Sequence, residues 1–168
     1  GMNPQTSIIS SDETQPYQIL KVKFDSNTFG VIVLELNLSG QKQPLTLYLS
    51  QVCDPLDGMV RWLEQLAAGQ LPAVWEIQSE VSTRPHVYLH VNPLADDRVE
   101  LRITNNVEAN SDTPTLLQGI FRRKQLVRDF LKDFKTFLRE RFLPQHWKTD
   151  LRELNLSQIR LLLDRKSG

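Results

Sequence analysis

The chain has 168 residues with 20 Lys+Arg and 20 Asp+Glu, and this zero net charge disfavours a uniformly basic nucleic-acid-binding protein. Its length suits one domain whose buried core is large enough to be stable without disulfides. The single cysteine excludes intrachain disulfides and CxxC-type metal sites. No apolar run approaches the roughly 18 residues of a membrane-spanning helix, and no signal peptide is recognisable, so we expect a cytoplasmic protein with no membrane partner.

The first 15 residues are polar and predict a disordered tail, in which Gly1 ahead of Met2 is a remnant of expression cloning. Residues 16–168 are expected to form a single α+β domain. Its first element is Tyr17–Phe24, where apolar residues alternate with lysines as in a half-buried strand.

Two further alternating runs, Val31–Leu38 and Leu45–Leu49, flank a turn that contains Gly40 and therefore predict a hairpin. A helix should follow. Asp54 is a candidate N-cap ahead of a proline at the first helical position, and the apolar 3-4 spacing continues to Ala68, before a glycine suited to the C-terminal turn.

The order of a strand, a hairpin and a helix is then repeated. Ala73–Glu80 is a predicted strand, and His86–Val91 and Arg98–Thr104 alternate in matching fashion and predict a second hairpin. A polar loop separates this hairpin from the longest helical pattern in the chain.

That pattern covers Pro114–Leu143, with Thr113 as candidate N-cap and a proline at position 144 as the stop. Its apolar positions form one stripe, which predicts a helix lying on the sheet. A straight helix of this length would measure about 45 Å, more than a small sheet can cover, so we expect a kink or a late start near Gly119, or packing of the C-terminal tail under the overhang.

The tail itself does not fit one helical stripe. Two short helices, split near Asn155 with Ser157 as candidate cap, fit its apolar residues better. Together these elements predict an α+β fold: a mostly antiparallel sheet of about six strands in two βββα units, helices packed on one face, and a short helical C-terminal tail.

Charge is unevenly distributed along the chain. Residues 1–115 hold 7 Lys+Arg and 14 Asp+Glu, whereas residues 116–168 hold 13 and 6, so the two parts carry −7 and +7. The candidate partner-binding residues all lie in the basic part: Arg122, Arg123, Lys124, Arg128, Lys132, Lys135 and Arg139. The last four follow i, i+4, i+7, i+11 spacing along one helix flank, although a solvated face also explains such a line.

Residues that could carry catalysis do not form a recognisable motif. His86 and His90 would lie about 13 Å apart on a strand, too far to share a metal ion. Cys53 sits at a strand-to-helix junction without a nucleophile signature. The strand carboxylates could act as an acid–base pair only if two of them met: Glu35, Glu76, Glu80 and Glu100. Nucleotide-binding, hydrolase and EF-hand patterns are absent from the sequence, and we expect no cofactor and no metal.

These observations favour a non-enzymatic protein-interaction or regulatory domain that meets an acidic protein partner through the open face of its sheet or the basic flank of the long helix. The alternative is binding of nucleic acid or another polyanion through the basic flank of the long helix. An enzyme whose site cannot be read from the sequence is the third hypothesis. We expect a monomer or a weak homodimer.

Overall fold

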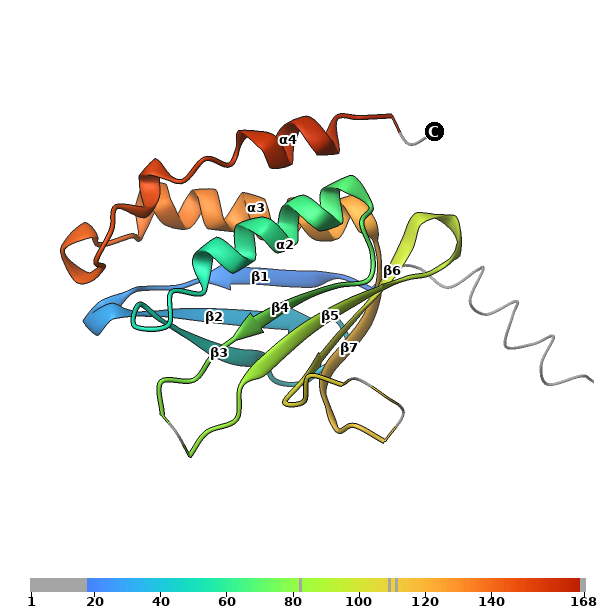
Figure 1. The fold of residues 1–168 in the computed structure, drawn as a ribbon, viewed down its shortest axis with the longest axis horizontal. Helices are drawn as coiled ribbons and strands as arrows, with labels where there is room; N and C mark the ends of the chain where they lie inside the picture. The colour runs from blue at the N-terminus through green and yellow to red at the C-terminus, as the bar shows by residue number, and fades with distance from the viewer. Residues whose placement is uncertain (1–17, 82, 109, 111, 167–168) are drawn as a thin grey trace, which may run out of the picture.

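The computed structural model describes residues 18–81, 83–108, 110 and 112–166, and the tail predicted for residues 1–15 lies outside them. Strands and helices follow one another as three strands, a helix, four strands and two further helices (Figure 1). Short 3-10 turns connect some of these elements: η1 (Thr28–Gly30), η2 (Ala95–Asp97), η3 (Pro144–His146) and η4 (Leu151–Glu153). None of the described helices is both long enough and apolar enough to cross a membrane.

The first sheet is antiparallel with the order β1 (Leu20–Phe24), β2 (Val31–Leu38) and β3 (Leu45–Ser50). Leu36 on β2 lies opposite Leu45 on β3, as expected for the predicted hairpin. One face of this sheet is apolar because the alternate, buried residues of β1 and β2 share it: Leu20, Val22, Phe24, Ile32, Leu34, Leu36 and Leu38.

The second sheet is also antiparallel, with the order β4 (Ala73–Ile77), β5 (Val87–Pro93), β6 (Arg98–Thr104) and β7 (Thr115–Arg122). The hairpin predicted from β5 and β6 is confirmed, since Val91 lies opposite Leu101. The α+β class with antiparallel sheets is therefore confirmed, but the strands belong to two sheets of three and four strands, and the second unit is ββββα.

The prediction of one helix over Pro114–Leu143 was wrong in its first part. Residues Thr115–Arg122 form β7, and the helix α3 runs from Arg123 to Glu140. Its 18 residues measure about 27 Å, which the sheet can cover. The late start removes the excess length that the sequence pattern implied.

Alternate burial along β7, and the packing of Phe121 over Gly119, explain why this segment is extended. Leu117, Gly119 and Phe121 are buried at alternate positions, which is the period of a strand. The ring of Phe121 lies back over Gly119, where an added Cβ would come within 2.7 Å of Phe121 Cζ. The apolar residues at both parities also satisfied helical spacing, and this ambiguity produced the error.

Two predicted caps are also corrected. The helix α2 (Leu56–Ala68) is preceded by Pro55, and Asp54 makes no capping hydrogen bond to it. The helix α4 (Ser157–Leu163) begins with Ser157, whose N–H donates to Asn155 Oδ1 over 3.1 Å, so Ser157 is not the cap. The split of the tail near Asn155 is confirmed by η4 and α4 on either side of it.

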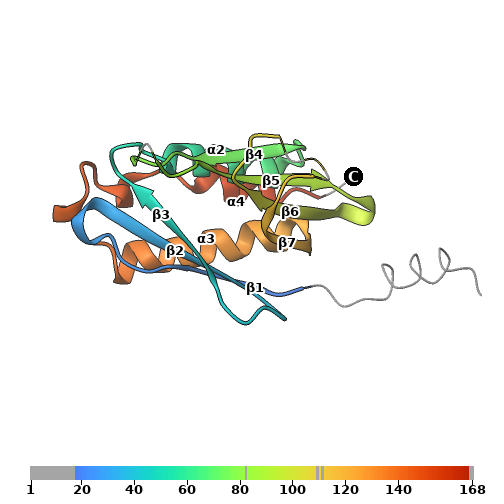
Figure 2. The same ribbon diagram turned by 90° about the horizontal axis from the view of Figure 1, so that it is seen from below.

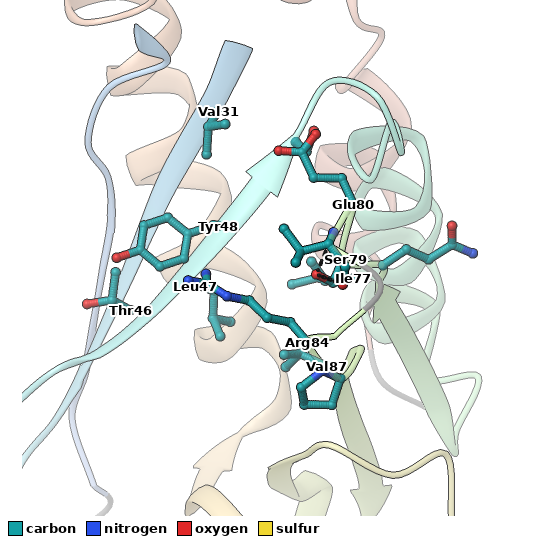
Figure 3. A pocket seen from close by; sticks show the side chains of 13 residues that line it. Val31, Thr46, Leu47, Tyr48, Ile77, Ser79, Glu80, Arg84 and Val87 are labelled. Atoms are coloured by element: carbon teal, nitrogen blue, oxygen red, sulfur yellow. Dashed lines mark hydrogen bonds between the residues drawn. The ribbon is translucent and has the colours of Figure 1, made fainter. Parts of the chain in front are cut away.

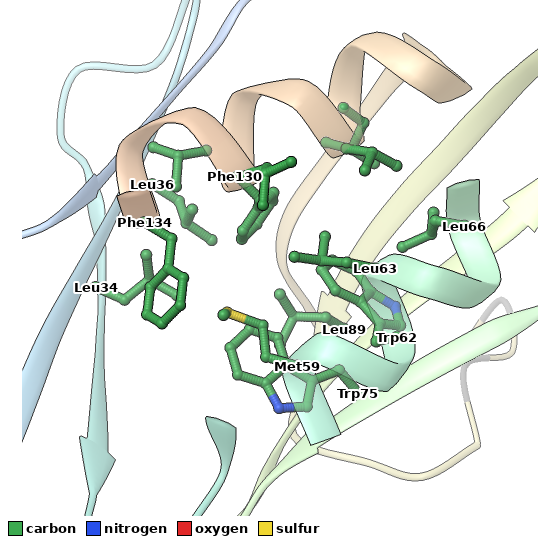
Figure 4. Packing of buried hydrophobic residues seen from close by; sticks show 14 of the residues in the cluster. Leu34, Leu36, Met59, Trp62, Leu63, Leu66, Trp75, Leu89, Phe130 and Phe134 are labelled. Atoms are coloured by element: carbon green, nitrogen blue, oxygen red, sulfur yellow. The ribbon is translucent and has the colours of Figure 1, made fainter. Parts of the chain in front are cut away.

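The elements are arranged in layers. The sheets form the lower layer in Figure 1, α2 and α3 cover their inner face, and α4 lies above these helices. Figure 2 shows β2 and β3 running obliquely across α3, with β4 and β5 beside α2. The aromatic centre of the core is Trp62 on α2, which contacts Trp75 on β4 and Phe130 on α3 (Figure 4).

The orientation of α3 is fixed where it meets the outer edge of β1. The Phe24 N–H donates to Asp133 Oδ2 over 2.6 Å, and Arg141 Nε donates to the Phe24 carbonyl over 2.9 Å. Arg141 Nη2 also donates to Asp133 over 3.1 Å. These bonds satisfy the end of an edge strand and hold one face of α3 inward, so the opposite flank faces outward.

Candidate functional site

The outward flank of α3 forms one wall of a groove of about 670 Å³, and α4 forms the other wall. All four residues of the predicted basic line, Arg128, Lys132, Lys135 and Arg139, line this groove. At 100° per residue, their spacing keeps them within about 60° of the helix circumference. The structure thus brings these four predicted residues together on one surface.

A fifth basic residue comes from the facing helix. Arg160 on α4 lines the same groove, and its positive charge acts on Lys135. The sequence pattern gave no reason to join Arg160 to the basic line, because the two segments are separated by the turns after α3. Only the return of the tail across the helices reveals it.

The two helices run in opposite directions, as Figure 1 shows. Lys124, in the first turn of α3, donates from Nζ to the carbonyl of Arg165, just past α4, over 2.6 Å. Arg160, earlier on α4, lies near Lys135, later on α3. Asp164 therefore belongs to the end of the groove near the start of α3, and Arg160 to the more basic part.

The positive charges of the groove are not neutralised by ion pairs. Among the described residues, no carboxylate oxygen lies within 4.0 Å of the charged nitrogens of its five basic residues. Burial lowers the pKa of Lys135 below its usual value of 10.5, and the charge of Arg160 lowers it further. Both causes mean that the free protein holds the Lys135 ammonium in an unfavourable environment.

Two carboxylates also line the groove, Asp129 and Asp164. Burial raises the pKa of Asp129, while a 2.9 Å hydrogen bond from Gln125 and the charge of Lys132 act in the opposite direction. The groove is thus mainly basic but has acidic positions, and its floor contains the nearly buried Leu131 and Leu163.

The other predicted basic cluster is dispersed by the fold. Arg122 is exposed at the end of β7, whereas the side chain of Arg123 is buried, with 7% of the residue exposed. Arg123 Nη1 donates to the carbonyls of Leu66 and Ala67 over 2.7 and 2.8 Å. Its guanidinium also forms a two-bond pair with Asp97, at 2.7 and 3.1 Å.

The role of Arg123 is therefore to bind the C-terminal carbonyls of α2, where a positive charge is favoured by the helix dipole. Lys124 is held by the carbonyl of Arg165. Neither residue lines the groove, and the tripeptide is not a continuous basic surface.

The histidines and strand carboxylates fall into separate small clusters. His86 Nδ1 and the Tyr88 hydroxyl both lie 3.2 Å from Glu76 Oε1 on the outer face of the second sheet. His90 Nε2 lies 3.2 Å from Thr104 Oγ1. In the described part of the chain, no group of three His, Cys, Asp or Glu residues is arranged to hold a metal ion.

The remaining candidates for chemistry are equally separate. Glu100 accepts a 2.6 Å hydrogen bond from Gln118, and Glu80 accepts one of 2.9 Å from Ser50. Cys53 is a free, half-buried thiol in the turn between β3 and α2. In the described part of the chain, the hydrogen bonds of Glu76, Glu80 and Glu100 go to different partners, so the acid–base pair remains a prediction without a geometric basis.

A second concave feature lies between the two sheets. It is a cleft of about 280 Å³ between β3 and the β4–β5 pair, lined by aliphatic side chains such as Leu47 and Val87 and by polar ones that include Glu80 and Arg84 (Figure 3). The hydrogen bond from Ser50 to Glu80 joins the end of β3 to the β4–β5 loop at one end of the cleft. Of the candidate residues named from the sequence, Glu80 lines this cleft, whereas the seven basic partner-binding candidates lie elsewhere.

Comparisons of the chain with protein-family models, with curated proteins and with solved structures find no significant match.

Proposed function

We propose that this protein is a non-enzymatic interaction domain whose groove between α3 and α4 binds an acidic segment of a protein partner. One observation carries the proposal: five basic side chains from two helices converge on one groove, and no carboxylate of the described residues lies within ion-pair distance of them. The single cysteine is a free thiol, as suits the reducing cytoplasm, where we place this function.

Electrostatic energy supports a binding role for the groove. Like charges at i, i+4 spacing weaken a helix by about 0.2–0.5 kcal/mol per pair, and Arg160 adds repulsion from the second helix. A partner's carboxylates would turn each of these repulsions into an attraction. Such complementarity increases specificity and association rate more than it increases bulk affinity.

An acidic protein fits the groove better than a nucleic acid does. Asp129 and Asp164 would repel a continuous phosphate backbone, whereas a protein partner can present neutral or basic residues to them. None of the described residues that line the groove is aromatic, so these residues offer no surface on which bases could stack. Nucleic-acid binding therefore remains the second candidate, without a specific observation in its favour.

Capture of partners from a lysate of the native host tests the proposal. The groove variant carries Arg128→Glu, Lys132→Glu, Lys135→Glu and Arg139→Glu. The control variant carries the same change in net charge at exposed positions outside the groove: Lys21→Glu, Lys23→Glu, Lys42→Glu and Arg61→Glu. Circular dichroism should show that both variants are folded.

We expect wild type and control variant to retain the same partner, identified by mass spectrometry as a protein with an acidic segment, and the groove variant to lose it. Binding should also weaken as salt is added, because the pairs are close to solvent. Equal capture by the groove variant would contradict the proposal, as would a partner that is removed by nuclease treatment.

A further inference from the structure

We infer that the acidic segment is an α-helix that lies lengthwise in the groove, with acidic side chains at i, i+4, i+7 and i+11. This inference rests on the proposed function and adds the shape and pattern of the occupant. It is carried by three features of the groove: the repeat of its charges, the form of its walls and the position of its carboxylates.

The repeat of the charges is that of a helix-to-helix seam. From Arg128 to Arg139 the basic residues alternate steps of four and three, and the line extends about 16 Å at 1.5 Å per residue. This alternation is the one that keeps a seam facing a neighbouring helix in left-handed packing. A partner helix with the same alternation matches every charge, whereas an extended chain has a different rise per residue.

The walls of the groove are themselves helices. α3 and α4 line its two sides and run in opposite directions, with α4 packed on α2, so the groove is bounded by helix surfaces along which a third helix can lie. Leu131 and Leu163 lie at its floor with only 5% and 6% of each residue exposed. Little apolar surface is left to bury, so the contact must depend mainly on charge and be weak and sensitive to salt.

The carboxylates give the occupant a polarity. Asp164 lies at the end of the groove near the start of α3, and Lys135, Arg139 and Arg160 form the opposite, more basic part. The acidic side chains of the partner helix should therefore be concentrated over the second half of α3. A lysine or neutral residue should face Asp164.

Two stapled helical peptides of identical composition test this inference. Each has about 18 residues, enough to cover the basic line, and each carries four glutamates in an Ala/Gln background. In the patterned peptide the glutamates follow i, i+4, i+7, i+11 spacing, and in the permuted peptide they are spread around the helix. Fluorescence anisotropy at low salt measures binding to wild type, groove variant and control variant.

We expect the patterned peptide to bind wild type and control variant about tenfold more tightly than the permuted peptide, because the latter reaches about half of the charges. The groove variant should bind neither peptide. It should instead bind a patterned peptide in which lysines replace the glutamates, and this exchange also shows that the variant is folded.

The alternative outcomes separate the inference from the proposed function. Equal affinity for both peptides, lost in the groove variant, would overturn the helical pattern but leave an acid-binding groove. If neither peptide binds but the groove variant still fails to capture the partner that wild type captures, the helical form of the occupant is wrong and the acid-binding groove stands. Tighter binding of a single-stranded oligonucleotide of similar charge than of either peptide would overturn both.

Discussion

Replacing Arg123 with leucine is expected to lower the free energy of unfolding by about 3 kcal/mol, because it removes one buried partner and leaves several polar groups behind. The carbonyls of Leu66 and Ala67 lose their donor, and Asp97 loses its paired cation. For a chain of this size, the loss corresponds to a fall in Tm of roughly 6–12 °C.

Urea unfolding of three variants measures this effect. Arg123→Lys keeps the charge but cannot reproduce the two-bond contact with Asp97, so we expect an intermediate loss. Arg128→Leu, an exposed position on the same helix, should change stability by no more than about 0.5 kcal/mol. If Arg123→Leu costs no more than Arg128→Leu, the junction between α2 and α3 does not depend on this arginine.

Arg160→Glu is expected to have effects of opposite sign on stability and on binding. The free protein should become more stable by about 0.5 kcal/mol, because a repulsion with Lys135 becomes an attraction. Affinity for the patterned acidic peptide should fall about fivefold or more, because one attraction becomes a repulsion. Arg61→Glu on α2 is the matched control and should change neither property appreciably.

The pH dependence of stability provides a second readout of the same pair. The pKa of Lys135 is lowered in the folded protein, so between that lowered value and the usual 10.5 the unfolded chain binds more protons. The contribution of Lys135 to stability therefore rises with pH across this window. In Arg160→Glu the pKa of Lys135 returns towards its usual value, and the rise should become smaller. If Arg160→Glu lowers stability at pH 7 and leaves the affinity for the patterned peptide unchanged, the claim that the positive charges of the groove are uncompensated is contradicted.

The strands other than β7 and the helix α2 could be predicted because the spacing of their apolar residues in the sequence matches the positions that the fold buries. In β2, every second residue is apolar and every second residue is buried. β7 could not be predicted, because its apolar residues satisfy helical and strand spacing equally well. Gly119 alone favoured a strand, and its reason, the ring of Phe121 folded over it, is a contact that a one-dimensional pattern does not contain.

The site could be predicted only in part for a related reason. Charges on one helix keep a fixed geometry, so the line from Arg128 to Arg139 survives the change in the start of α3. The sequence pattern groups Arg123 with Arg122 and Lys124 as a candidate binding residue, although it places Arg123 near the apolar stripe. Its position at the β7–α3 junction directs its side chain to the end of α2. Arg160 joins the groove only because α4 returns across the helices, and that topology is not encoded in local spacing.

Backbone amide chemical shifts of the labelled protein, followed during titration with the patterned acidic peptide, test the groove as a binding surface most directly. We expect saturable shifts in residues 125–139 of α3 and in residues 157–164 of α4, and no such shifts in the groove variant. Shifts centred on the cleft between the sheets around Tyr48 and Glu80, or on the outer face of β4–β7, would contradict the assignment.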